Sequence, residues 1–142
     1  MYNILVHAHS GLRYVVLLLL IAAIVDGYRR SQAGSKKNQL ALFALIFTHL
    51  QLVLGLILYF ISPKVQFASG VMKDSVLRFY TVEHISLMLI AIILITIGYS
   101  RGKKLLPAAE GYRRTAFFYL IGLVLILISI PWPFRNLGAG WF

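Results

Sequence analysis

Residues 4–25, which read ILVHAHSGLRYVVLLLLIAAIV, decide the fold class of this chain. The stretch is predominantly apolar and as long as the ~20 residues that a helix needs to cross the ~30 Å hydrocarbon core of a bilayer. Because no water satisfies the backbone there, such a segment must be helical. The stretch therefore predicts a transmembrane helix that carries two histidines and an arginine within it.

The rest of the chain has three more apolar segments of this kind. The protein has 142 residues, is 60% hydrophobic and contains four acidic residues, which excludes an ordinary soluble domain. We predict a single all-α domain over residues 1–142, an integral membrane four-helix bundle. Its helices are expected at about residues 4–28, 39–61, 77–100 and 112–130, followed by an interfacial aromatic tail at 131–142. Docking of that tail on another subunit is the alternative.

The basic residues cluster between the apolar segments. Nine lie in the first and third connections: Arg29, Arg30, Lys36, Lys37, Arg101, Lys103, Lys104, Arg113 and Arg114. Four lie on the opposite side: Lys64, Lys73, Arg78 and Arg135. The positive-inside rule therefore places both termini on the outer, periplasmic side. The clusters fit topology signals and lipid headgroup partners, and no nucleic-acid-binding face is predicted.

Several kinds of active site are excluded by composition. The chain has no cysteine, so disulfides, thiolate metal sites, iron–sulfur clusters and covalent c-type haem attachment are ruled out. It also lacks a Ser–His–Asp ordering, a glycine-rich phosphate loop and an HExxH motif. A stand-alone enzyme is therefore not expected, and an electron-transfer protein or subunit is the better interpretation.

Two histidines in different helices lie at the same expected depth. At ~1.5 Å per residue, His9 and His84 both fall about 8 Å to the outer side of the bilayer midplane. Two level imidazoles in a bundle core are what a bis-histidine haem b requires, so His9 and His84 are the candidate metal ligands. An ordinary packed histidine pair is the alternative.

Four further residues complete the candidate cofactor site. Arg13 lies one turn after His9 and needs an anionic partner, either a haem propionate or Glu83. His7 is a candidate whose simpler interpretation is an interfacial residue. His49, near the middle of the second span, is either a proton-transfer group or an interhelical hydrogen-bonding residue that contacts Thr48, Gln51 or Ser86.

Four segments resemble a known family: HAHSGLRYVVLLLL, FTHLQLVLGLILYFISPKVQF, LRFYTVEHISLMLIAIILITIGYSRGKK and LISIPWPFRNLGAGWF. They are similar to the small four-helix bacterial membrane proteins labelled cytochrome b or cytochrome-b-like. The resemblance implies haem b binding, electron transport and a multi-pass location in the bacterial inner (cytoplasmic) membrane. It carries over to His7, His9 and Arg13 in the first span and to Glu83 and His84 in the third.

The leading hypothesis is a single-haem protein that passes electrons between a quinol and a respiratory partner. In it, His49, with Gln51 or Glu83, takes the quinol proton. The first alternative is a proton or small-ion pathway without a cofactor, along His9, Arg13, His49 and Glu83. The second is a non-catalytic accessory subunit of a larger complex or a homodimer, in which the polar residues serve as interhelical contacts.

Overall fold

The computed structural model describes residues 1–30 and 36–142, and these residues are helical almost throughout. The helices are α1 (Tyr2–Arg30), α2 (Gln39–Ile61), the one-turn α3 (Ser75–Arg78), α4 (His84–Leu105) and α5 (Ala109–Ser129). A π-helical turn, Phe79–Glu83, joins α3 to α4, and short 3-10 turns lie at Val71–Lys73 and Pro133–Arg135. The second helix has the bounds expected from the sequence. Helix α1 extends two residues beyond its expected range at each end. The third span, Ser75–Leu105, begins two residues earlier and ends five residues later than expected, and α5 begins three residues and ends one residue earlier.

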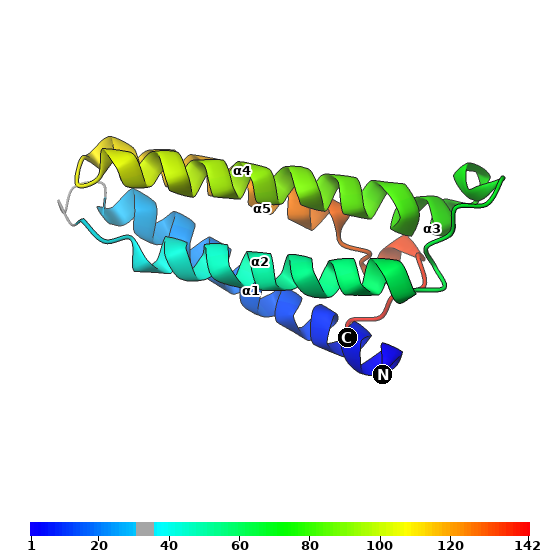
Figure 1. The fold of residues 1–142 in the computed structure, drawn as a ribbon. Coiled ribbons are helices and arrows are strands. Elements are labelled where there is room, and N and C mark those ends of the chain that lie inside the picture. Colours follow the sequence, from blue (N-terminus) through cyan, green and yellow to red (C-terminus); the bar gives the residue numbers. More distant parts are fainter. Residues whose placement is uncertain (31–35) are drawn as a thin grey trace.

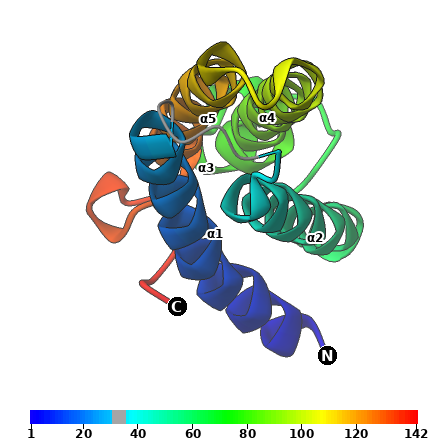
Figure 2. The same cartoon turned by 90° about the vertical axis from the view of Figure 1, so that its left-hand side faces the viewer.

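The four long helices run alongside one another as a bundle (Figure 1). Helix α1 packs against α2 and α5, α5 packs against α4, and α2 touches α4 only slightly (Figure 2). Each span is long and apolar enough to cross a membrane. Large apolar side chains such as Leu18 and Phe60 are 68% and 82% exposed, which suits a lipid environment. The chain is therefore a multi-pass membrane protein.

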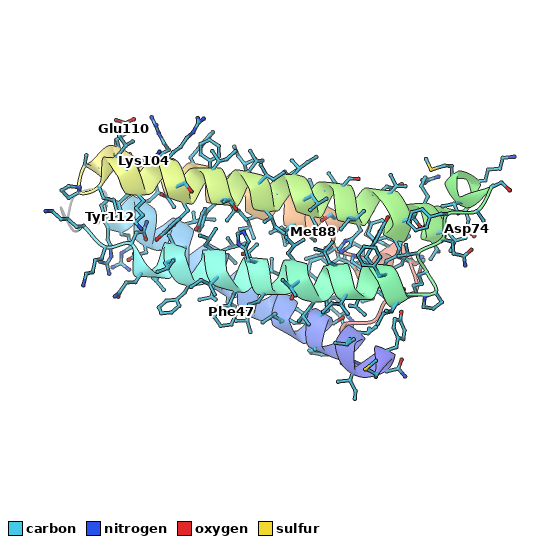
Figure 3. All side chains as sticks on the ribbon, viewed as in Figure 1. Phe47, Asp74, Met88, Lys104, Glu110 and Tyr112 are labelled. Carbon is cyan, nitrogen blue, oxygen red and sulfur yellow. The ribbon has the colours of Figure 1, made fainter. Side chains whose placement is uncertain are left out.

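The bundle has two distinct ends, as Figure 1 shows. Both termini and the segment between α2 and α3 lie at one end, called here the terminal end. At the other end, α1 finishes at Arg30 and α4 at Leu105, and we call it the basic end because nine of the fourteen basic residues belong to it. Figure 3 shows Lys104 and Glu110 at the basic end and Asp74 at the terminal end.

Glycines let α4 and α5 pack closely against each other. A Cβ atom added at Gly98 would lie 2.3 Å from Phe118 Cβ, and one at Gly122 would lie 2.5 Å from Ile95 Cγ1. Small residues at such contacts let membrane helices approach closely, with packing rather than hydrophobic burial holding them together. Gly98 is therefore a packing residue inside α4, which runs on to Leu105.

Helix α1 takes an oblique course. Its C-terminal half lies close to α5, where a Cβ atom on Gly27 would meet Ala116 Cβ at 3.0 Å. Its N-terminal half leans away from α4, as both ribbon views show (Figures 1 and 2). The apolar core accordingly sits toward the middle and the basic end, around Leu20, Ala44 and Ile95. At the terminal end, where α1 diverges, a cavity lies between the helices.

Candidate functional site

A cavity of about 360 Å³ occupies the terminal end of the bundle. This size lies within the ~300–1,000 Å³ typical of ligand pockets. Helix α1 lines it with Tyr2, Val6, His9, Ser10, Arg13 and Val16. These positions follow the three- and four-residue spacing of a single helix face. The corresponding faces of α2 and α4 supply Thr48, Gln51, Leu52, Gly55, Leu58, Tyr59, His84, Ile85, Met88 and Ile92. Figure 3 places Met88 between α4 and α2.

The structure brings His9 and His84 together across this cavity. Their ring centroids are 6.4 Å apart and their ring planes are 79° from parallel. A metal–imidazole bond is about 2.0–2.1 Å long and the ring centre lies about 1.1 Å beyond the nitrogen, so two imidazoles opposed across one metal have centroids about 6.3 Å apart. The separation of this pair therefore matches a bis-histidine site.

The end of α5 orients the His84 ring. His84 Nδ1 is 2.7 Å from the carbonyl oxygen of Ser129, so Nδ1 carries the proton and donates it to that oxygen. This leaves Nε2 as the nitrogen with a free lone pair, because a neutral imidazole has one donor and one acceptor. A second nitrogen held by a backbone carbonyl is the usual support for a metal-bound histidine.

The proline pair of the PWP motif explains why that carbonyl accepts from a side chain. The last carbonyls of a helix have no partner within it, and Pro131 and Pro133 carry no N–H that could supply one. The Leu127 carbonyl instead accepts from Trp132 Nε1 at 3.0 Å, and the Ser129 carbonyl accepts from His84. Since Ser129 is fully buried, its carbonyl needs such a partner.

A π-helical turn sets the direction of His84 from the other side. Residues Phe79–Glu83 form this turn, and the His84 N–H bonds to the Phe79 carbonyl five residues earlier. Such a turn contains one residue more than an α-turn and therefore rotates α4 relative to α3 by about 100°. The Phe79 ring packs 5.7 Å from the His84 ring, centroid to centroid. Single π-turns in helices are frequent at functional sites.

Two residues of α2 hold His9. Gln51 Nε2 donates to the His9 carbonyl oxygen at 2.8 Å, which pins α1 to α2 at this level. Gly55 faces the His9 ring, and a Cβ atom there would lie 3.1 Å from His9 Cε1. The glycine therefore makes room for the imidazole.

Three buried polar atoms in the described residues have no hydrogen-bond partner: His9 Nδ1, Arg13 Nε and Gln51 Oε1. All three residues line the cavity. Buried polar groups without partners are rare, and each needs an explanation such as a bound ion or ligand. Their coincidence around one cavity indicates a site arranged for a polar or metal-containing molecule.

Two cations line the same cavity, and each holds a carbonyl of the tail. Arg13 is only 8% exposed and donates through Nη2 to the Trp141 carbonyl at 2.7 Å. Lys64 donates to the Gly138 carbonyl, and burial lowers the pKa of its ammonium group. Among the described residues neither cation forms a salt bridge, because the carboxylate partners belong to Arg30, Arg78 and Arg114. An anionic ligand would meet two cations here.

The structure separates the remaining candidates from this cavity. Glu83 pairs with Arg78 at 2.7 Å, so it is not the partner of Arg13. His49 is one residue away from the cavity face of α2; its Nδ1 donates to the Leu45 carbonyl and its Nε2 lies 3.4 Å from Thr96. His49 therefore forms an interhelical hydrogen bond, as one alternative expected, but the partners predicted for it were wrong. His7 is exposed on a different face of α1.

The C-terminal tail, residues 131–142, was expected to lie at the membrane interface, but it also contacts the bundle. It folds back on α1, where the Trp141 carbonyl accepts from Tyr14 as well as from Arg13 and the Phe142 ring lies 5.5 Å from the Tyr14 ring. Gly138, Gly140 and Phe142 line the cavity. Trp141 and Phe142 remain 55% and 71% exposed, so anchoring in the membrane interface stays a prediction.

The donor set suits a cofactor that brings most of its own metal ligands. In the parts of the chain that the structure describes, no three His, Cys, Asp or Glu side chains are grouped to hold a bare metal ion. A haem needs only two axial ligands from the protein. Comparisons with family models, with curated proteins and with solved structures find no match for this chain.

Sequence reasoning missed Gln51 as a clamp, the Ser129 carbonyl as the partner of His84, and the π-turn. The sequence did contain a signal for one of them. Two prolines at the second and fourth positions after a helix end indicate that the last carbonyls of that helix need donors from side chains. The Gln51 clamp depends on a contact between segments that are 42 residues apart, for which the sequence has no local signal.

Proposed function

We propose that this protein binds one haem b between His9 and His84 and transfers electrons within a membrane. The observation that carries the proposal is the 6.4 Å separation of the two imidazole centroids across a cavity. It is supported by the fixed Nδ1 of His84 and by the unpartnered Nδ1 of His9. A haem bound here would supply one-electron redox chemistry, while the protein sets its potential through ligands, burial and nearby charge.

The residues of this chain have separate tasks in that site. His9 and His84 bind the metal, with Ser129 orienting one ring and Gly55 leaving room for the other. Arg13 and Lys64 pair with the two propionates, which offsets the cost of burying cations in a membrane protein. Apolar side chains such as Met88 and Ile92 exclude water from the macrocycle.

The proposed setting follows the charge distribution. We place the terminal end on the outer, periplasmic side of a bacterial inner membrane, because the basic end carries the excess of Lys and Arg. A quinol and a respiratory partner are the proposed electron donor and acceptor. His49 and Glu83 do not line the cavity, whereas Gln51 does. Its amide can hydrogen-bond a quinol hydroxyl but cannot take the proton, so we assign the proton to no residue of the cavity.

The same geometry weighs against the ion-pathway alternative. That pathway needs His9, Arg13, His49 and Glu83 in sequence across the membrane. Glu83 pairs with Arg78, and His49 contacts Thr96. The described residues therefore form no continuous row of polar side chains across the membrane.

The optical spectrum of the purified protein tests the haem proposal. The oxidised and dithionite-reduced protein, expressed with ample haem, is expected to show b-type bands at about one haem per chain. His9→Ala and His84→Ala should each reduce haem content at least about tenfold, because the loss of one axial ligand removes a metal bond. His7→Ala and His49→Ala are the matched controls and should keep the spectrum.

Two results would overturn the proposal. One is a folded, colourless protein from haem-replete cells, which would make the histidines an ordinary packed pair. The other is an unchanged b-type spectrum in both His9→Ala and His84→Ala.

A further inference from the structure

A second pocket lies at the basic end, far from the histidines along the bundle. Its volume is about 240 Å³, and it lies between the start of α2 and the end of α4. Three lysines line it, Lys36, Lys37 and Lys103. The haem proposal assigns this pocket no role.

The described residues that line the pocket include hydrogen-bond donors but no acidic residue. Asn38 is 9% exposed, and its Oδ1 accepts a hydrogen bond from the Ala41 N–H. The Asn38 side chain lines the pocket, and its amide is a potential donor there. The carboxylates of this end are engaged elsewhere, Asp26 with Arg30 and Glu110 with Arg114. The arrangement favours an anion.

The start of α2 adds to this preference. Asn38 is its N-cap and Gln39 its first residue, and both line the pocket. A helix N-terminus carries about half a positive charge and presents N–H groups that lack partners. Together with the lysine ammonium groups and the Asn38 amide, it forms a concave surface of donors.

The apolar part of the lining identifies the kind of anion. Leu42, Leu106 and the ring of Tyr99 form the remaining wall, and Lys103 Nζ lies 5.9 Å from the centre of that ring. Leu42 is 38% exposed, within the first turn of a membrane-spanning helix. A ligand here has its charged group beside the lysines and an apolar part beside the lipid-facing surface.

We propose that this pocket binds the phosphate headgroup of an anionic membrane phospholipid. Basic pockets between transmembrane helices on the cytoplasmic side are a recognised type of headgroup site. The phosphate oxygens accept from Lys36, Lys103 and Asn38 Nδ2, and the acyl chains extend along Leu42. The lipid bridges α2 and α4, which touch each other only slightly in the protein itself.

Native mass spectrometry of the protein in mild detergent tests this site. The probes are phosphatidylglycerol and phosphatidylcholine with identical acyl chains. The wild type is expected to retain phosphatidylglycerol with at least about tenfold preference. Lys36→Gln/Lys103→Gln should lose most of that preference. Arg101→Gln/Lys104→Gln is the matched control, since it removes two exposed charges from the same end without touching the pocket, and it should keep the preference.

Several outcomes decide against the site. Equal losses in the two double variants would mean diffuse attraction to the whole basic end. A wild type without preference would remove the proposal. Displacement of phosphatidylglycerol by millimolar inorganic phosphate would assign the pocket to a free anion instead. If Lys36→Gln/Lys103→Gln fails to fold, Lys103→Glu alone serves as the second variant, and retention of the preference there would contradict the proposal.

This test is independent of the haem. The mass of bound lipid is read equally in haem-loaded and haem-free protein. A colourless protein would therefore leave the result interpretable.

Discussion

The two ends of the bundle use the same helices in opposite ways. At the basic end, a Cβ atom added to Gly102 would lie 2.0 Å from Thr115 Oγ1, so α4 and α5 leave no space between them. At the terminal end, a cavity of about 360 Å³ separates α1, α2 and α4. One end is held by backbone contact, and the other is held apart by histidines, an arginine and a folded-back tail. The difference indicates that close packing of α4 against α5 holds the bundle together where the other helices diverge.

Filling the tight end is expected to have the largest effect on stability. In Gly102→Ala, the new methyl group meets Thr115 Oγ1 and, at 2.6 Å, the Gly111 carbonyl, and this backbone atom cannot move aside easily. We expect a loss of about 1–3 kcal/mol in the free energy of unfolding. Thermal unfolding in detergent, followed by circular dichroism, measures it.

Gly11→Ala is the control for that change. Gly11 also lies within a helix, but nothing lies within 4 Å of an added Cβ atom. Alanine should therefore raise stability by about 0.5–1 kcal/mol through its helix propensity. Equal stability of the two variants would show that the contact between α4 and α5 is not tight.

Under the haem proposal, filling the open end should change cofactor binding rather than the fold. In Gly55→Ala, the methyl group would lie 3.1 Å from His9 Cε1, so the imidazole must shift by a few tenths of an ångström. We expect haem to remain bound but to dissociate several-fold faster, with an altered electron paramagnetic resonance signal of the ferric protein. Gly11→Ala should alter neither, and an unchanged signal in Gly55→Ala would mean that His9 is not a ligand.

The smallest expected effect is on the pH dependence of stability, and it concerns Lys64, which lines the cavity at the terminal end. Burial lowers the pKa of its ammonium in the folded protein, so the unfolded chain binds more protons between that pKa and the usual value of about 10.4. Stability from this group therefore increases as the pH rises through that interval. The melting temperature of wild type relative to Lys64→Gln should rise by about 1 °C or less from pH 8 to pH 10.5.

Lys73→Gln provides the control for this pH series. Lys73 is an exposed lysine at the same end. Its substitution should leave the pH dependence of the wild type unchanged. If the melting temperature of wild type minus that of Lys64→Gln fell between pH 8 and pH 10.5, the assigned direction of the Lys64 pKa shift would be contradicted.

Much of the architecture could be predicted from the sequence, because membrane spans are governed by length and hydropathy. The four helices and the level pair His9 and His84 follow from counting residues along apolar segments. Depth along the helix is a local property, so the error in one span does not affect another. That is why two residues 75 positions apart in the chain could be paired from the sequence.

The rotation of each helix could not be predicted in the same way. Nearly all faces of α1 and α2 are apolar, so the sequence does not tell which face points inward. The hydrogen-bond partners named for His49 depended on that rotation and were wrong, because its interhelical bond goes to Thr96. The pairing of Glu83 with Arg13 was also wrong, since Glu83 pairs with Arg78. The tail contact with Arg13 joins residues 128 positions apart and has no local signal.

The π-turn before His84 has a consequence for how such a chain can evolve. Because the turn holds one residue more than an α-turn, it sets the angular phase between the segment at the cavity mouth and the cavity face of α4. A single-residue deletion within Phe79–Glu83 would leave the register of α4 against α5 intact while turning the mouth segment by about 100°. The segment before the turn and the cavity face of α4 that carries His84 could thus change separately in evolution, because this one turn sets the angle between them.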